Sequence, residues 1–312
     1  MVNWTKRPGK AHWTEYHVDI EGQMQPVKPR FNTRIKKLWD DRYFYVGTRL
    51  DEPHVWGTVA ERNAVIFNDN DFEVFIDPDG DSHSYYEFEM NTLNTMWNLF
   101  MDKPYKHGGK VFIREMPGQK SGVYVMGTLN DPSDTDEYWM MEIAFPWKAM
   151  AEPAHCACPP EDGDRWRVNF SRVEWSHKVV EGKYVRVPSK KGRTDDLHED
   201  NWIWSPQSVV NMHRPETWDY VQFSTQPAGS PVKFHADPTA KLRYLLHKIL
   251  YAQEGYHLKH KFYAGTLKEL GFYESIYKKV MKISVLQTAG DTWDVRGQVT
   301  LTNGAVRKVH IR

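Results

Sequence analysis

The chain has 312 residues with 41 basic and 41 acidic side chains, and 40% of its residues are hydrophobic. This composition is typical of a folded protein with one large domain or two smaller ones, and it excludes disorder as the main state. No apolar run approaches the roughly 18 to 20 residues that a membrane-spanning helix requires, so no membrane span is predicted.

The net charge of zero conceals two halves of opposite sign. Residues 229–312 carry 14 Lys and Arg against 6 Asp and Glu, whereas residues 1–228 carry 27 against 35. The difference indicates two units, and it predicts that the basic C-terminal unit docks on the acidic one. It gives no indication of nucleic-acid binding.

The two cysteines, Cys156 and Cys158, lie in a Pro-rich stretch. They are too few for a disulfide framework or a four-cysteine zinc site, and two free thiols are favoured over a strained bridge. The first residues lack the apolar stretch of a secretory signal. The protein is therefore cytoplasmic, or secreted if a leader was removed, and the sequence leaves both readings open.

Short segments of alternating polarity, separated by turn residues, predict antiparallel strands through the first two thirds of the chain. Asp40-Asp41 and the segment 77–81 are the clearest turns between them. This pattern favours a β-sandwich over residues 1–224. The predicted strands are Arg34–Trp39, Tyr43–Arg49, Asp71–Ile76, Tyr85–Asn91, Val123–Leu129, Trp139–Ala144 and Trp166–Trp175.

The character of the chain changes after a segment rich in turn formers, which predicts a linker over residues 225–236. Helical spacing of apolar residues then predicts a helix from Asp237, as N-cap, to His260, with Pro238 in the first turn. A short helix is expected over Thr266–Leu270, ending at Gly271. Three strands follow, with Asn303-Gly304 as a hairpin turn: Met281–Gln287, Thr292–Leu301 and Val306–Ile311. The predicted fold class is mainly β, an antiparallel β-sandwich followed by a small α+β unit over 237–312.

Two of the predicted strands carry acidic residues on one face only. Since side chains alternate along a strand, one face holds Phe72, Val74, Ile76, Phe88 and Met90, and the other holds Asp71, Glu73, Phe75, Asp77, Glu87, Glu89 and Asn91. Carboxylates accept hydrogen bonds from sugar hydroxyls, and aromatic rings stack on the apolar face of a sugar. Phe67, Tyr85 and Trp97 are the nearest rings, so this face predicts a site for a polyhydroxylated ligand. The alternative is a solvated outer face of the sheet.

Several motifs, in the same order, resemble the family 9 carbohydrate-binding modules and their DOMON-like relatives over roughly residues 14–224. They are Leu38-Trp39-Asp40, Tyr43–Val46, Asp51-Glu52-Pro53, Asn70–Asp77, Tyr85–Asn91, Glu142–Trp147 and Asn169–Arg172. The resemblance implies a β-sandwich that clamps a terminal sugar between two aromatic rings, with structural calcium nearby.

Carried over by position, the resemblance places Phe67 at the first clamp ring, Glu73 at a binding glutamate and Asn91 at a binding asparagine. Two positions depart from it. Glu89 stands in place of an arginine, and Met212 stands in place of the second clamp tryptophan, with His213 and Trp218 close by. The charge reversal at position 89 favours a cationic ligand, a metal or proton-transfer chemistry over the family's own mode of sugar binding.

The strand 166–175 adds Arg172 and Glu174, and Arg172 is expected to be the positive partner of the acidic pair. Two functions remain open. The first is a protein that recognises a mono- or oligosaccharide end, or another small polar ligand. The second is an enzyme on the same sandwich, a hydrolase, lyase or isomerase, that uses Glu73, Glu89 or His213 in acid–base chemistry.

A metal is suggested by the turn that contains Asp77, Asp79 and Asp81, whose oxygens are of the kind that Ca²⁺ binds. The alternative is a solvated acidic turn. The sequence contains no Gly-rich phosphate loop, so neither a nucleotide nor an organic cofactor is predicted.

Overall fold

The computed structural model describes residues 17–18, 24–25, 29–187, 199–205, 207, 211–273, 281–287 and 293–311. The chain divides into two compact units, Met1–Lys233 and Phe234–Arg312. This boundary lies within the segment predicted to be a linker. Among the described residues, no helix combines the length and the apolar character needed to cross a membrane.

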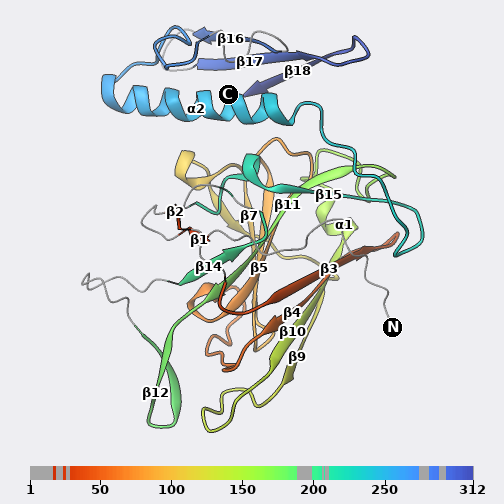
Figure 1. Ribbon diagram of the computed structural model, residues 1–312, viewed down its shortest axis with the longest axis vertical. Helices are drawn as coiled ribbons and strands as arrows, with labels where there is room; N and C mark the ends of the chain where they lie inside the picture. The colour runs from red at the N-terminus through yellow and green to blue at the C-terminus, as the bar shows by residue number, and fades with distance from the viewer. Residues whose placement is uncertain are drawn as a thin grey trace. The chain divides into compact units, whose positions relative to one another are not determined.

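The first unit is an antiparallel β-sandwich (Figure 1). Its smaller sheet has the strand order β3-β4-β10-β9, and its larger sheet has the order β14-β11-β5-β6-β7-β8, with β15 also paired to β11. The smaller sheet comprises β3 Thr33–Trp39, β4 Tyr43–Asp51, β9 Lys120–Met126 and β10 Tyr138–Pro146. The larger sheet comprises β5 Asp71–Asp77, β6 Tyr85–Asn91, β7 Met96–Met101, β8 Val111–Ile113, β11 Arg165–Glu174, β14 Asp200–Ile203 and β15 Asp219–Gln222.

Short elements complete this unit. A two-residue pair, β1 His17–Val18 and β2 Met24–Gln25, and a hairpin, β12 His177–Val180 and β13 Lys183–Arg186, stand outside the two main sheets. One helical turn, α1 Trp147–Met150, follows β10. The described loops contain the 3₁₀ turns η1 Ile66–Asn68, η2 Tyr105–His107 and η3 Pro215–Thr217.

The main core lies between the two sheets, and the alternation predicted for β5 and β6 is confirmed. Phe72, Val74 and Ile76 of β5 are fully buried in this core, together with Phe88 and Met90 of β6. Apolar side chains of β4, β10 and β11 meet them from both sheets. Because successive side chains alternate, the acidic residues of β5 and β6 must lie on the opposite face of the larger sheet.

A buried ion network ties the two sheets together at one end of the core. The Arg172 guanidinium, on β11, is 2.8 Å from Glu52 Oε2 and 2.9 Å from Glu174 Oε2, and all three side chains are almost fully buried. Arg172 also donates to the carbonyl of Asp51 at 3.0 Å, at the end of β4. Burial and the neighbouring Glu174 raise the pKa of Glu52, so the network depends on the guanidinium between the two acids.

In the second unit, the helix α2 Ala240–His260 packs on a three-stranded antiparallel sheet of β16 Met281–Gln287, β17 Trp293–Thr300 and β18 Val306–Ile311. Leu242, Leu246 and Ile249 of the helix are buried against valines of β17 and β18. A Cβ at Gly297 would lie 2.5 Å from Leu242 Cδ1, so the glycine allows the close approach of helix and sheet.

Three of the predicted elements differ from the structure. The helix begins at Ala240, not beside Asp237, because the Asp237 carboxylate accepts a hydrogen bond from the Thr239 N–H and closes a separate turn. The short helix expected over 266–270 is wrong, since the Leu270 and Gly271 N–H groups close three-residue turns only. The strand predicted at 123–129 ends at Met126, because Gly127 has a φ of 147° and the chain turns there. Residue 292, the first of a predicted strand, lies outside the described residues.

The ion network makes a prediction for stability. Arg172→Met should lower the free energy of unfolding by about 3–5 kcal/mol, because it leaves Glu52 and Glu174 buried without a cation. Denaturant unfolding followed by tryptophan fluorescence measures this, since every tryptophan except Trp293 precedes residue 234. The control is Arg62→Met, which removes an exposed ion pair with Glu115 and should change stability by less than about 1 kcal/mol. Equal effects of the two substitutions would contradict this role of Arg172.

Candidate functional site

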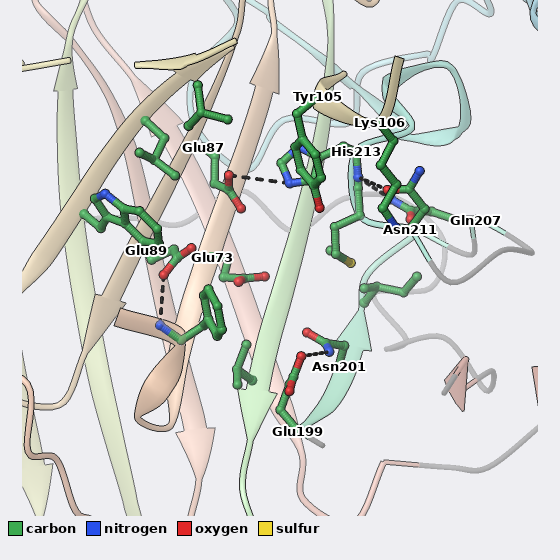
Figure 2. A pocket seen from close by; sticks show the side chains of 17 residues that line it. Glu73, Glu87, Glu89, Tyr105, Lys106, Glu199, Asn201, Gln207, Asn211 and His213 are labelled. Carbon is green, nitrogen blue, oxygen red and sulfur yellow. Dashed lines mark hydrogen bonds and ion pairs between the residues drawn. The ribbon is translucent and has the colours of Figure 1, made fainter. Parts of the chain in front are cut away.

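The acidic face of the larger sheet forms the floor of a pocket of about 360 Å³ (Figure 2). Glu73 of β5 and Glu87 and Glu89 of β6 supply the floor. Residues of η1, η2, β7, β11 and β14 and of the loop that contains Asn211 to His213 supply the walls. The pocket therefore lies on the side of the sheet away from the main core.

The floor follows from the pairing of β5 with β6. Glu73 lies opposite Glu89 in this register, and Glu87 lies opposite Phe75. Each of the three glutamates is at most 6% exposed. The alternative of a solvated outer face is therefore wrong, because loops and the ends of neighbouring strands cover these carboxylates.

Two rings form one wall beside the acids. The Phe67 and Trp97 rings have centroids 6.3 Å apart and planes inclined by 30°, so they pack on each other and form one apolar surface. The Phe67 N–H donates to Glu89 Oε2 at 2.9 Å, and the Phe67 carbonyl accepts from Trp175 Nε1 at 2.8 Å. These two hydrogen bonds fix the η1 turn, and with it the ring of Phe67, at the edge of the floor.

His213 contacts the floor at Glu87, as the dashed line between the two in Figure 2 shows, and its ring packs edge-on against Tyr105 with centroids 4.6 Å apart. Its Nδ1 is 2.9 Å from the Tyr85 hydroxyl, and its Nε2 is 3.7 Å from Glu87 Oε2. Burial, with a contribution from the charge of Lys106, lowers the pKa of His213 to about 3. The imidazole is therefore neutral at physiological pH.

Hydrogen bonds to its backbone fix the loop that carries His213. The Met212 carbonyl accepts from Trp218 Nε1 at 3.0 Å and from Gln207 Nε2 at 3.3 Å. Trp218 packs on Phe75 and Tyr85, which lie on the pocket side of the sheet. Met212 and His213 line the pocket, whereas Tyr85 and Trp218 lie beneath its surface and support it.

The electrostatics of the floor are those of crowded, buried acids. Burial raises the pKa of Glu73 to about 7. Burial, together with the charge of Glu73, raises the pKa of Glu87 well above its usual range, and burial with repulsion from Asp71 does the same for Glu89. The carboxyl groups do not all ionise near neutral pH unless a ligand or a cation compensates them.

Asn91 does not line the pocket, although its position along β6 places it on the same face. Its amide donates to the Val59 carbonyl and to Asp69, and its Oδ1 accepts from the N–H groups of Leu93 and Thr95. Asn91 is therefore the organising residue of the turn after β6, and all of its side-chain hydrogen-bonding groups are occupied there.

Arg172 and Glu174 also lie outside the pocket, and Arg172 is not the partner of the Glu73–Glu89 pair. On β11, Ser171 is the residue paired with Glu73, so the even-numbered Arg172 and Glu174 project to the opposite face. There they form the buried network with Glu52. From this strand, Val173 is the residue that reaches the pocket.

The turn between β5 and β6 brings one oxygen each of Asp77, Asp79 and Asp81 within 4.8 Å of one another. The Asp77 carboxylate, fully buried, accepts from the N–H groups of Gly80 and Ser82, and Asp79 accepts from the Asp81 N–H. These hydrogen bonds account for the turn without a cation. Calcium at this position stays a prediction.

Several residues that line the pocket were not singled out as site residues from the sequence. Glu87 of the floor lies on the predicted acidic face and shares the spacing of Glu73 and Glu89, so the alternation of β6 was a sufficient signal for it. Others come from loops or strand ends, where no periodicity indicates direction, and they are Tyr105, Lys106, Glu199, Asn201, Gln207 and Asn211.

Comparisons with known proteins agree with the resemblance found in the sequence. Residues 8–158, just under half of the chain, match the model of the carbohydrate family 9 binding domain-like family. None of the curated proteins matches the chain.

Three solved structures are similar over most of their own length. One is a protein from Bacteroides uniformis proposed to bind carbohydrate, with 18% identity, a TM-score of 0.44, and coverage of 63% of this chain and 80% of that one. The other two are family 9 carbohydrate-binding modules from Caldicellulosiruptor kristjanssonii. The complex with cellotriose has 11% identity, a TM-score of 0.36 and coverage of 71% and 87%. The complex with glucose has 12% identity, a TM-score of 0.39 and coverage of 75% and 98%.

The low pKa of His213 predicts how stability depends on pH. The folded state keeps the ring neutral down to about pH 3, whereas the unfolded chain takes up a proton below pH 6.5, so this residue removes stability as pH falls through 6.5. Between pH 7 and pH 5 the loss is about 2 kcal/mol. In denaturant unfolding, His213→Asn should abolish this part of the decline in the free energy of unfolding with falling pH. His155→Asn, at an exposed position, should leave the decline in place. Parallel declines in all three proteins would contradict the assignment.

Proposed function

We propose that the pocket on the larger sheet binds a carbohydrate and recognises the end of a mono- or oligosaccharide. The observation that carries this proposal is the joining of an apolar ring wall, Phe67 and Trp97, to a floor of buried carboxyl groups in one cavity. A sugar has the same division, since its C–H face is apolar and its hydroxyls are polar. The match of residues 8–158 to the carbohydrate family 9 binding domain-like family supports the same class of ligand.

In this proposal, the ring wall takes the apolar face of the terminal sugar. Phe67 is 37% exposed, so its ring is accessible from the mouth of the pocket. Because the two rings pack on each other, the sugar lies against one aromatic wall and not between two rings. Met212, on the loop opposite, supplies an apolar contact in place of a second ring.

Glu73 is the principal hydrogen-bonding residue in this proposal. One of its oxygens, Oε2, is buried and has no hydrogen-bond partner among the described residues. Glu89 already accepts the Phe67 N–H, so it has less capacity left for a ligand. A hydroxyl that donates to Glu73 would satisfy an acceptor that the folded chain leaves open.

A glycan array followed by calorimetry tests the proposal. For the best-bound glycan, Glu73→Gln should weaken binding roughly 10- to 100-fold, the loss expected for a hydrogen bond to a charged group. Phe67→Ala and Trp97→Ala should each weaken it roughly 3- to 10-fold through lost stacking. The matched control is Phe112→Ala, which removes a 45% exposed ring outside the pocket and should not change the affinity. The absence of any bound glycan would reject the proposal.

A second candidate function is acid–base catalysis on the bound ligand, as in a hydrolase, lyase or isomerase. The observation that favours it is a Glu73 pKa of about 7, which lets the carboxyl group give and take a proton near neutral pH. Glu89 lies opposite Glu73, and His213 supplies a neutral imidazole across the pocket.

Incubation of the protein with glycans from the array, with product analysis by mass spectrometry, distinguishes the two functions. An enzyme that uses both acids should lose turnover by 100-fold or more, roughly the contribution of one acid–base group, in Glu73→Gln and in Glu89→Gln. Glu89→Gln should retain most of the binding. Turnover that persists in both variants would reject the catalytic roles, and a bound but unchanged glycan supports the binding function.

A further inference from the structure

Two acids of the pocket floor, Glu73 and Glu89, form a cluster with Asp71, which is fully buried and does not line the pocket. Asp71, Glu73 and Glu89 each place one carboxylate oxygen within 4.8 Å of the other two. Asp71 and Glu73 come from β5, and Glu89 comes from β6, so two rigid paired strands hold all three. The exposed fractions are 0%, 5% and 2% respectively.

Asp71 provides an independent indication that this cluster takes a ligand. Both of its carboxylate oxygens are buried, and neither has a hydrogen-bond partner among the described residues. An unsatisfied buried acceptor destabilises a fold by about 1–3 kcal/mol, and more when the group is charged, so native structures rarely keep one. Oε2 of Glu73, in the same cluster, is likewise buried and has no hydrogen-bond partner among the described residues.

The neighbouring aspartates show that the chain satisfies buried carboxylates where no ligand is needed. Asp69, two residues before Asp71, accepts hydrogen bonds from the N–H groups of Thr58 and Val59, from the Thr58 hydroxyl and from Asn91. Asp77, six residues after Asp71, accepts two backbone N–H groups. Asp71 lies between them and has neither kind of partner.

No lysine or arginine among the described residues forms an ion pair with any of the three acids. The arginine of the adjacent strand, Arg172, points to the other face of the sheet and pairs with Glu52 and Glu174. Glu89 gives Oε2 to the Phe67 N–H and keeps Oε1 for another partner. The cluster therefore combines three acidic groups with free oxygens, and no fixed cation from the described part of the chain compensates them.

We propose that Asp71, Glu73 and Glu89 bind a calcium-sized divalent cation in the floor of the pocket. All-oxygen ligands select hard cations. Calcium–oxygen bonds of about 2.3–2.6 Å permit two ligand oxygens to be up to about 5 Å apart, and the three oxygens of this cluster lie within 4.8 Å of one another. Mg²⁺ demands bonds of about 2.1 Å in a near-ideal octahedron and gives up its waters reluctantly, so three buried carboxyl groups on two paired strands favour calcium.

Three carboxylates do not complete the six to eight ligands that calcium takes. Glu73 and Glu89 line the pocket, so the remaining ligands come from its side, as water or as ligand hydroxyls. The cation site stands without the sugar-binding proposal. Only coordination of a sugar by the cation rests on that proposal, because the hydroxyl oxygens of a bound sugar would then be direct ligands of the cation.

The test titrates CaCl₂ into the full chain after treatment with EDTA and removal of the chelator, with no sugar present. Calorimetry should show calcium binding, and the substitutions Asp71→Asn and Glu89→Gln should each lower the calcium affinity at least tenfold. MgCl₂ should bind at least tenfold more weakly than CaCl₂. The double variant Asp79→Asn/Asp81→Asn is the matched control, because it removes the acids of the other cluster and should leave this isotherm within twofold.

A second readout is tryptophan-sensitised terbium luminescence, which should fall in Asp71→Asn and not in the control. The melting temperature measured in EDTA shows whether a variant has lost only the cation site or has also lost its folded structure. Asp71→Asn removes a buried charge, so its melting temperature should equal or exceed that of the unaltered protein. If Asp71→Asn does not fold, Glu89→Gln serves in its place, since its amide oxygen still accepts the Phe67 N–H.

Two results would overturn the proposal. One is the absence of both a heat of calcium binding and terbium emission at concentrations up to several millimolar. These concentrations exceed the dissociation constant of about 1 mM of the weakest extracellular calcium sites. The other is an isotherm that survives in Asp71→Asn and disappears in the Asp79/Asp81 double variant, which would place the cation at the β5–β6 turn. Since the titration contains no sugar, neither result bears on whether the pocket binds a glycan.

Discussion

The pairing register of β5 with β6 is the constraint on which the rest of the first unit depends. With Glu73 opposite Glu89, Val74 falls opposite Phe88 on the other side, so one face of the sheet makes the core and the other makes the pocket floor. A slip by one residue would exchange the two faces, placing carboxylates between the sheets. Burial of the apolar face therefore fixes the positions of the acids.

The same sheet treats its two groups of buried acids differently. On the core side, Arg172 lies between Glu52 and Glu174 and neutralises them within the protein. On the pocket side, Asp71 and Glu73 retain buried oxygens without partners among the described residues, and burial raises the pKa of each group. The first group stabilises the fold, whereas the second is compensated only by protons or by something that enters from outside.

Much of this arrangement was accessible from the sequence, because a period of two assigns faces directly. It identified the strand pair, the position of the core, and the meeting of Glu73 and Glu89. The sequence did not show that Asn91, although it lies on the pocket face of β6, does not line the pocket. Its side chain bonds to Val59 and Asp69, and these bonds depend on loops that no periodic pattern describes. Strand β7 was missed because Met96–Met101 is almost uniformly apolar, and the walls contributed by loops gave no periodic signal.

The hydrogen bond from the Phe67 N–H to Glu89 has a consequence for how such a protein diverges. An arginine at position 89 has no acceptor for that N–H, so the reversal of charge also requires a new anchor for the η1 turn and its ring. In a set of homologous sequences, an arginine at position 89 should therefore occur together with another acceptor for the residue 67 N–H. A change of ligand preference through position 89 would then require a compensating replacement near the η1 turn, with a lone exchange of Glu89 selected against.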